Sequence, residues 1–406
     1  MEYLNGKVVI LASMLGLYPL IVIPNPIDYF YFPRYIVLVI VSMIALLFIA
    51  KNLTKITHRA LIPLGLFILF AFLSTILAIE PMKAWTGSIR YSGFSTYLFC
   101  IILFFLAYSN NNVNLKRLID SMIICASLVS FTALLQHFGL NIVPHELVRA
   151  TYASFGTMAN PNFLGTYTAF ILPASIISYM RYSKRIYLLS TAMIYAGLIV
   201  CVTRGAWITF GIAFIYLLYY YLKIFNKRKL ILHVTLVLFI TTVFLLSTSD
   251  GIILNRILSI SNEVTSAIAL EDSAGSNRML VWKKVVELIS EHWLFGIGPD
   301  NLNLTIVKNE TNFFVDKAHN IFLEMAVTMG IFAMLSYMAF LSFFLRMWKG
   351  EQEIMFSTMI LSYIIQGQFN IDVVMIMPIF WIVLGLSLAN MEKHKGSKWT
   401  AYCVKS

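Results

Sequence analysis

The stretch "IYLLSTAMIYAGLIVCVTRGAWITFGIAFIYLLYYYL", residues 186–222, contains a single charged side chain, Arg204. A helix rises about 1.5 Å per residue and the hydrocarbon core of a bilayer is about 30 Å thick, so one helix through this stretch would be about twice as long as a membrane is thick. The chain must therefore fold back within it. The segment "TRGAW" (203–207) is predicted to be a tight hairpin at a membrane surface.

The rest of the chain is similarly apolar. Of its 406 residues, 59% are hydrophobic and 12% charged, whereas about a quarter of the residues in soluble domains are charged. The short alternating segments typical of transmembrane barrels do not occur in the sequence. We therefore expect an all-α polytopic membrane protein with about twelve transmembrane helices. They are predicted near residues 7–23, 35–50, 60–79, 95–108, 118–138, 162–180, 186–203, 205–222, 230–247, 321–345, 354–369 and 373–390.

Twelve spans place both termini on the same side of the membrane, and the positive charges indicate which side. The loops on the side of the termini hold nineteen Lys and Arg residues, in short segments. The opposite side holds eleven, six of them in the long loop 248–320. Short loops rich in Lys and Arg stay in the cytoplasm, so we expect cytoplasmic termini in a bacterial inner membrane. The net charge of +11 is then mainly a topology signal and gives no reason to expect nucleic-acid binding.

The predicted topology leaves one long loop, residues 248–320, on the outer side. Within the long loop, "NRMLVWKKVVELISEHW" (277–293) has an apolar stripe that includes Val281 and Val285, with most of its charges off the stripe. An amphipathic helix at the membrane interface fits this pattern. The topology divides the chain into four predicted parts: helices 1–9 with short loops in 1–247, the extracytoplasmic loop 248–320, helices 10–12 in 321–390, and a cytoplasmic tail 391–406.

Among the arginines on the predicted outer face, four stand out as contrary to the positive-inside tendency. They are Arg90 in "GSIRYSGF", Arg149 in "LVRATYASF", Arg204 in "VTRGAW" and Arg278 in "GSNRMLVW". One reading is that each extends to lipid headgroups. The other is that they bind phosphate, which guanidinium does with two parallel charge-assisted hydrogen bonds. A diphosphate held in the membrane suits several arginines on one face.

His319 lies in "KAHNIFLEMAVTMGIF" (317–332), directly before an apolar run. Imidazole is mostly neutral at pH 7 and can accept a proton, so His319 is a candidate general base. A histidine in this position also commonly caps a helix or packs at an interface. Asn320 and Glu324, one turn apart, either orient the ring or make ordinary hydrogen bonds at the helix end.

The segment "GTMANPNFLG" (156–165) starts the sixth predicted span, with Asn160 and Asn162 on either side of a proline. Simple turn chemistry explains such residues, and amide donors facing a sugar or phosphate are the alternative. The sequence contains no phosphate-binding P-loop, no CxxC pair, no Asp-x-Asp and no histidines at metal-ligand spacing. We therefore expect neither a metal nor a cofactor.

Taken together, the motifs resemble the O-antigen ligase and polymerase superfamily. This superfamily includes lipopolysaccharide O-antigen ligases, polysaccharide polymerases and bacterial protein O-oligosaccharyltransferases. The resemblance extends over about residues 74–388 in family order. It is carried by "STILAIEPMKAWTGSIRYSGFSTYL", "FGTMANPNFLGTYTAFILP", "TRGAWI", "NRMLVWKKVVELISEHWLFGIGPDNL", "AHNIFLEMAVTMGIFA" and "QFNIDVVMIMPIFWIVLGL".

The resemblance implies a metal-independent, inverting membrane glycosyltransferase with a GT-C-like fold. Its donor would be a glycan on undecaprenyl diphosphate. Arg204 and Arg278 resemble the diphosphate-binding arginines of the family, and His319 resembles its essential loop histidine. Arg90 matches an arginine that recurs in the first outer-loop motif. "MANPN" stands where the family pattern has "GNPN", which leaves the role of that turn open.

These expectations assign His319, Arg278 and Arg204 to catalysis. Substrate binding is assigned to Arg90, Arg149, Asn160, Asn162 and Glu324. The acceptor is a hydroxyl on a glycan, lipid or protein, and the sequence does not separate ligase from polymerase. A flippase for lipid-linked oligosaccharide is the alternative, although it needs a polar path across the bilayer and the predicted spans are almost uncharged. A non-catalytic scaffold would leave the outer arginines unexplained.

Overall fold

The computed structural model describes residues 6–50, 58–109, 114–143, 153–303, 315–345 and 350–403. Before the long loop lie α1 (Gly6–Gly16), α2 (Tyr31–Ala50), α3 (Leu61–Ile76), α4 (Pro81–Thr86), α5 (Phe94–Tyr108), α6 (Leu115–His137), α7 (Pro161–Tyr182), α8 (Arg185–Val200), α9 (Arg204–Tyr219) and α10 (Arg228–Ser247). From the loop onward lie α11 (Ile252–Ile268), α12 (Ala274–Glu291), α14 (Ile321–Met329), α15 (Ile331–Ser342), α16 (Glu351–Gln366) and α17 (Met377–Cys403). All regular secondary structure in these residues is helical, which confirms the all-α prediction.

The helices are those of an integral membrane protein. Five are long and apolar enough to cross a bilayer: α2, α6, α7, α10, and α9 with the π-helical turn Tyr220–Ile224 that extends it. Five shorter apolar helical segments accompany them, at Gly6–Leu20, Leu61–Ile76, Phe94–Tyr108, Arg185–Val200 and Ile331–Ser342. Each predicted span falls on one of the observed helices or on a pair of them. The number of crossings, predicted as twelve, stays a prediction.

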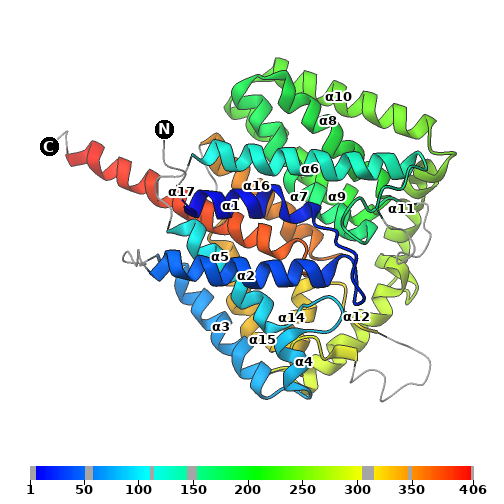
Figure 1. Cartoon of the computed structure of the whole chain (residues 1–406). Helices are drawn as coiled ribbons and strands as arrows, with labels where there is room; N and C mark the ends of the chain where they lie inside the picture. The colour runs from blue at the N-terminus through cyan, green and yellow to red at the C-terminus, as the bar shows by residue number, and fades with distance from the viewer. Residues whose placement is uncertain are drawn as a thin grey trace.

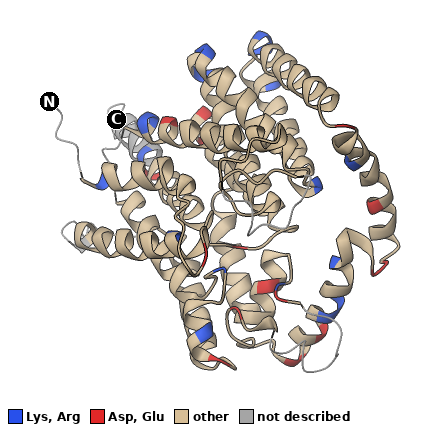
Figure 2. Cartoon of the chain, turned by 45° about the vertical axis from the view of Figure 1, so that its right-hand side comes forward, with Lys and Arg blue, Asp and Glu red and all other residues tan. Residues whose placement is uncertain are grey.

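The outward faces of these helices are apolar. Leu47, Ile62 and Phe239 are 66%, 68% and 64% exposed, which water would disfavour and lipid would not. Figure 2 shows the long helices almost free of charge, with charged residues at helix ends and along α11 and α12. In Figure 1, α1 begins and α17 ends on one side of the helix bundle, and α11 and α12 lie at the opposite side.

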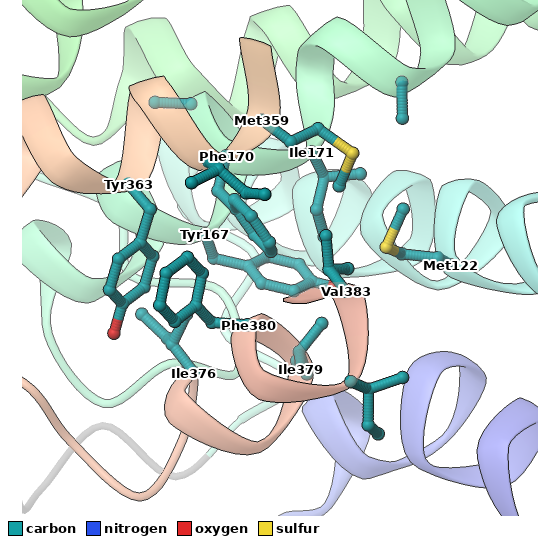
Figure 3. Close-up of a cluster of buried hydrophobic side chains, with 14 of the residues drawn as sticks. Met122, Tyr167, Phe170, Ile171, Met359, Tyr363, Ile376, Ile379, Phe380 and Val383 are labelled. Atoms are coloured by element: carbon teal, nitrogen blue, oxygen red, sulfur yellow. The ribbon is translucent and has the colours of Figure 1, made fainter. Parts of the chain in front are cut away.

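The centre of the bundle is α7, which is buried along its length and packs against α6, α8, α9 and α16. Figure 3 shows the core between α6, α7, α16 and α17, where Tyr167 and Phe170 meet Phe380. The rings of Tyr363 and Phe380 stack with centroids 3.8 Å apart. Aromatic side chains bury large apolar areas and pack specifically, so this core fixes the position at which α7 begins.

A buried arginine holds the segment before α7. Arg34 is 0% exposed and donates to the carbonyl oxygens of Pro19 at 2.7 Å and Thr157 at 2.9 Å. Asn160 then caps α7 by accepting the N–H of Asn162 at 2.8 Å, a common helix start. The turn chemistry considered for this segment is therefore present. The predicted break within 186–222 is present, because α8 ends at Val200 and α9 begins at Arg204, so the turn lies at 201–203 and most of "TRGAW" belongs to α9. Its place at a membrane surface stays a prediction.

The single span predicted over 321–345 is corrected by the structure, which divides it into α14 and α15 at Gly330. Gly330 has φ of 86°, a conformation that strongly favours glycine. A Cβ on Gly330 would lie 2.2 Å from the carbonyl oxygen of Leu294. The N–H of Ile331 donates to the carbonyl oxygen of Trp293 at 2.8 Å. The long loop thus inserts into the break, a contact between distant segments that hydropathy does not report.

Replacing Gly330 tests this contact. We expect Gly330→Ala to destabilise the protein by at least about 1–3 kcal/mol, since the backbone conformation and the close approach both exclude a side chain. A Cβ added at Gly211 in α9 would meet no atom within 4 Å, so Gly211→Ala should be neutral or stabilising by up to about 1 kcal/mol. Thermal unfolding in detergent, followed by circular dichroism, measures both. Equal Tm shifts for the two variants would contradict the role of Gly330.

Candidate functional site

Arg204 is the first residue of α9 and points into a cavity on the side of the bundle where α11 and α12 lie. Its Nη1 lies 2.6 Å from Oε1 of Glu263 and donates to the hydroxyl of Ser259 at 3.2 Å. Its Nη2 donates to the hydroxyl of Ser276 at 3.3 Å. The contacts come from α11 and α12, so residues far apart in the sequence fix the guanidinium.

The helix α11 was missed at the sequence level, where 252–268 was treated as loop. Its signal was present, because Ile253, Ile257, Ile260 and Val264 recur at helical spacing. Arg256 and Glu263, two turns apart, both line the cavity. Arg256 also donates from Nε to the carbonyl oxygen of Val202 at 3.3 Å, which ties α11 to the α8–α9 hairpin.

Arg278 is placed by an unusual turn within α12. Gly275, Ser276 and Asn277 have φ of 65°, 62° and 67°, so the right-handed helix starts only at Arg278. The N–H of Gly275 donates to Oε2 of Glu263 at 2.8 Å. Burial, followed by the nearby charge of Arg204, lowers the pKa of Arg278. Like charges are thus crowded here, as expected of a site that binds an anion.

We call this space the arginine cavity: about 290 Å³, lined by Arg204, Arg256, Arg278, Glu263 and Asn162 among others. Three helices begin at it: α7, α9 and the right-handed part of α12. Helix N-termini present free N–H groups and the positive end of the helix dipole, which bind phosphate readily. Within the described residues, no cluster of His, Cys, Asp or Glu could hold a metal ion.

The segment 315–320, which carries His319, is fixed by contacts on both sides of the histidine. On one side, the indole N–H of Trp282 in α12 donates to the carbonyl oxygen of Ala318 at 2.9 Å. On the other, Asn320 bonds Gln368 at 3.1 Å and caps α14 through the N–H groups of Phe322 and Leu323. Asn320 therefore has the helix-end role considered from sequence.

A buried ion cluster lies beneath this segment. Lys317, with its side chain 5% exposed, lies 2.6 Å from Asp300 and 3.1 Å from Glu324. The second oxygen of Glu324 accepts the N–H of Ala318 at 2.7 Å, and Asp300 accepts the hydroxyl of Ser88 at 2.9 Å. Burial lowers the pKa of Lys317, but the charges of Glu324 and Asp300 outweigh it and raise the pKa above its ordinary value. The cluster joins Ser88, Asp300 and the segment from Lys317 to Glu324.

His319 has a backbone φ of 51°, rare for a residue with a side chain and common at functional sites. Its Nδ1 is buried and has no hydrogen-bond partner within the described part of the chain. Burial, then the charge of Arg278, lower its pKa to about 4; Asp316 opposes this, and Arg90 adds to it. Arg90 pairs with Asp316 at 2.7 Å, so Arg90, Arg278 and His319 are electrostatic neighbours.

The remaining predicted site residues are placed differently. Asn162 lines the arginine cavity, whereas the side chain of Asn160 is engaged in capping α7. Glu324 was predicted to bind substrate, but both its oxygens are occupied by Lys317 and Ala318, so it acts on the geometry of the histidine segment. Arg149 lies outside the described residues.

Comparison with known protein families gives a match that includes this site. The family model described as O-antigen ligase matches residues 187–338. The matched range runs from α8 into α15 and so contains Arg204, Arg278 and His319. No curated protein matches the chain significantly.

Removing the lysine of the buried cluster should unfold the histidine segment. Lys317→Met leaves two carboxylates buried without a counter-charge, which typically costs about 3–5 kcal/mol. The matched control is Lys283→Met, whose partner Asp272 is 59% exposed; exposed pairs contribute about 1 kcal/mol or less. Thermal unfolding in detergent compares them. A Lys317→Met variant as stable as Lys283→Met would mean that the cluster does not support the fold.

Proposed function

We propose, from the premise that the chain belongs to the O-antigen ligase-related superfamily, that it transfers a glycan from undecaprenyl diphosphate to an acceptor hydroxyl. Members of this superfamily are membrane glycosyltransferases of the O-antigen ligase and polymerase type, which act in the synthesis of cell-surface polysaccharide. The reaction would take place on the extracytoplasmic face of a bacterial inner membrane. The observation that supports this most strongly is the arginine cavity beside His319.

The donor lipid would enter sideways from the outer leaflet, with its diphosphate in the arginine cavity. Arg204 and Arg278 would hold the phosphates through charge-assisted hydrogen bonds. As the bond between the anomeric carbon and the phosphate oxygen breaks, its electron pair goes to the diphosphate. Groups already placed to stabilise that growing charge often supply the largest catalytic effect.

The acceptor hydroxyl would attack the anomeric carbon from the face opposite the diphosphate, which inverts the configuration. Its proton would go to His319. In the free protein the pKa of this histidine is about 4, so it is neutral at pH 7 but weakly basic. A bound diphosphate offsets the positive charges of Arg278 and Arg90 that contribute to the low value. The donor would therefore raise the basicity of His319 when a base is needed.

Substitution at the three residues tests the assignment. We expect His319→Ala to lower kcat by about 10²–10⁴-fold, and Arg204→Ala and Arg278→Ala each to lower kcat/KM by about 10²–10³-fold. The assay follows release of undecaprenyl diphosphate from lipid-linked glycan of the source cells, in membrane vesicles that contain the native acceptor. Arg59→Ala, outside the site, is the matched control.

Three outcomes would contradict the proposal. A folded His319→Ala protein with full activity would exclude His319 as the base. Wild-type rates for both arginine variants would place the diphosphate elsewhere. Movement of labelled lipid-linked glycan between leaflets without transfer would favour a flippase.

The pH dependence tests the effect of the donor on His319. Imidazolium cannot take a proton, so activity falls as the pH drops through the pKa of the histidine. The parameter kcat/KM reports the free protein and kcat reports the donor complex. We expect kcat/KM to stay level as the pH is lowered to about 5. We expect kcat to fall already at about pH 6, because the pKa of His319 in the donor complex is closer to the ordinary pKa of histidine. Acidic limbs that coincide would show that the donor does not change the pKa.

A further inference from the structure

Glu263 is the one carboxylate among the charged residues that line the arginine cavity in the described part of the chain. Three guanidinium groups, from Arg204, Arg256 and Arg278, line the same cavity. A site built only to bind phosphate tightly gains nothing from a negative charge, which repels the ligand. Its presence therefore calls for a role other than simple affinity.

The charges of donor and product suggest that role. In the donor, the diphosphate links the lipid to the sugar, so each phosphate carries one negative charge and the total is −2. Three arginines against one glutamate give the cavity a net charge of +2, which balances the donor. After transfer the terminal phosphate is a monoester, which carries about −1.5 to −2 near neutral pH. The product is thus more negative than the donor.

We propose that Glu263 is a specificity-determining residue that reduces the affinity of the cavity for the more negative diphosphate monoester of the product relative to the diphosphate diester of the donor. This inference rests on the proposed function, since it assumes that the diphosphate occupies the arginine cavity. Repulsion between Glu263 and the additional charge of the product would promote release of the spent lipid.

The contacts of Glu263 hold its charge in the cavity. Oε1 pairs with Arg204 at 2.6 Å, and Oε2 accepts the N–H of Gly275 at 2.8 Å. The carboxylate is therefore fixed at both oxygens, by α9 and by the turn before Arg278. A side chain held in this way stays in place when a ligand binds, so its charge acts on both donor and product.

The same contacts permit another role, in which Glu263 only supports Arg204. The two roles predict effects of opposite sign for Glu263→Gln. Glutamine has nearly the same shape, keeps an oxygen acceptor and removes the charge. If Glu263 repels phosphate, ligands bind the variant more tightly, and the more negative ligand gains more. If Glu263 only supports Arg204, ligands bind the variant more weakly.

Two lipids that differ at the diphosphate end provide the test: farnesyl diphosphate, a monoester, and P1,P2-difarnesyl diphosphate, a diester. Isothermal titration of the purified full-length protein in detergent gives Kd for each. In Glu263→Gln both should bind more tightly, and the ratio of monoester Kd to diester Kd should fall roughly ten-fold, the order expected for one partly screened charge. An unchanged ratio, or weaker binding of both, would overturn the inference.

Two further variants distinguish a failure of the role of Glu263 from a failure of the proposed diphosphate site. Glu287→Gln removes an exposed charge from α12 away from the cavity lining and should leave the ratio unchanged; the same fall in this variant would overturn a specific role for Glu263. Arg204→Ala should lose affinity for both lipids. If it binds them like the wild type, the proposed diphosphate site is wrong. If it loses both while Glu263→Gln leaves the ratio unchanged, only the role of Glu263 is wrong.

Discussion

Repulsion among the guanidinium groups of one partly enclosed cavity is the constraint on which the side of the molecule that carries α11 and α12 depends. Arg204, Arg256 and Arg278 come from three different helices, yet all line the same space. Bringing them together without an anion is unfavourable. Glu263 offsets part of the charge, and the N-termini of α7, α9 and α12 add further positive potential. The arrangement is best explained if a negatively charged ligand completes it.

A second charge cluster serves a different purpose. Lys317 pairs with both Asp300 and Glu324, so each charged group of this cluster has an opposite charge within the protein. Its effect is geometric, because it fixes the segment that carries His319 against Asp300, which in turn bonds Ser88 between α4 and α5. The structure thus combines an ion-paired cluster beneath the segment of His319 with a cavity that has an excess of positive charge.

Sequence patterns predicted the elements whose signal is local. The apolar runs predicted the helices, the lone charge in 186–222 predicted a break near Arg204, and the ordered motifs predicted the family resemblance, which the match over 187–338 supports. Features that depend on distant contacts were not predicted. Nothing near Gly330 in the sequence reports that Leu294 inserts there. The amphipathic pattern of α11 was readable, but its place beside Arg204 depends on tertiary packing.

Among the candidate site residues, sequence reasoning selected those with unusual chemistry for their position, whose roles stay predictions, and it did not foresee the structural contacts of the others. The outer arginines Arg204 and Arg278 and the histidine His319 do lie near one another. Glu324 looked equally polar, but the structure uses it to hold Lys317. Arg256 was overlooked because one arginine in a long loop has no distinguishing pattern until the loop folds.

The most direct test of the account is the structure of the protein in lipid nanodiscs with an undecaprenyl-diphosphate-linked glycan bound. We expect both phosphates in the arginine cavity, with oxygens within hydrogen-bond distance of Arg204 and Arg278, and the first sugar on the side of His319. A diphosphate held elsewhere, with the arginine cavity empty, would contradict the central claim.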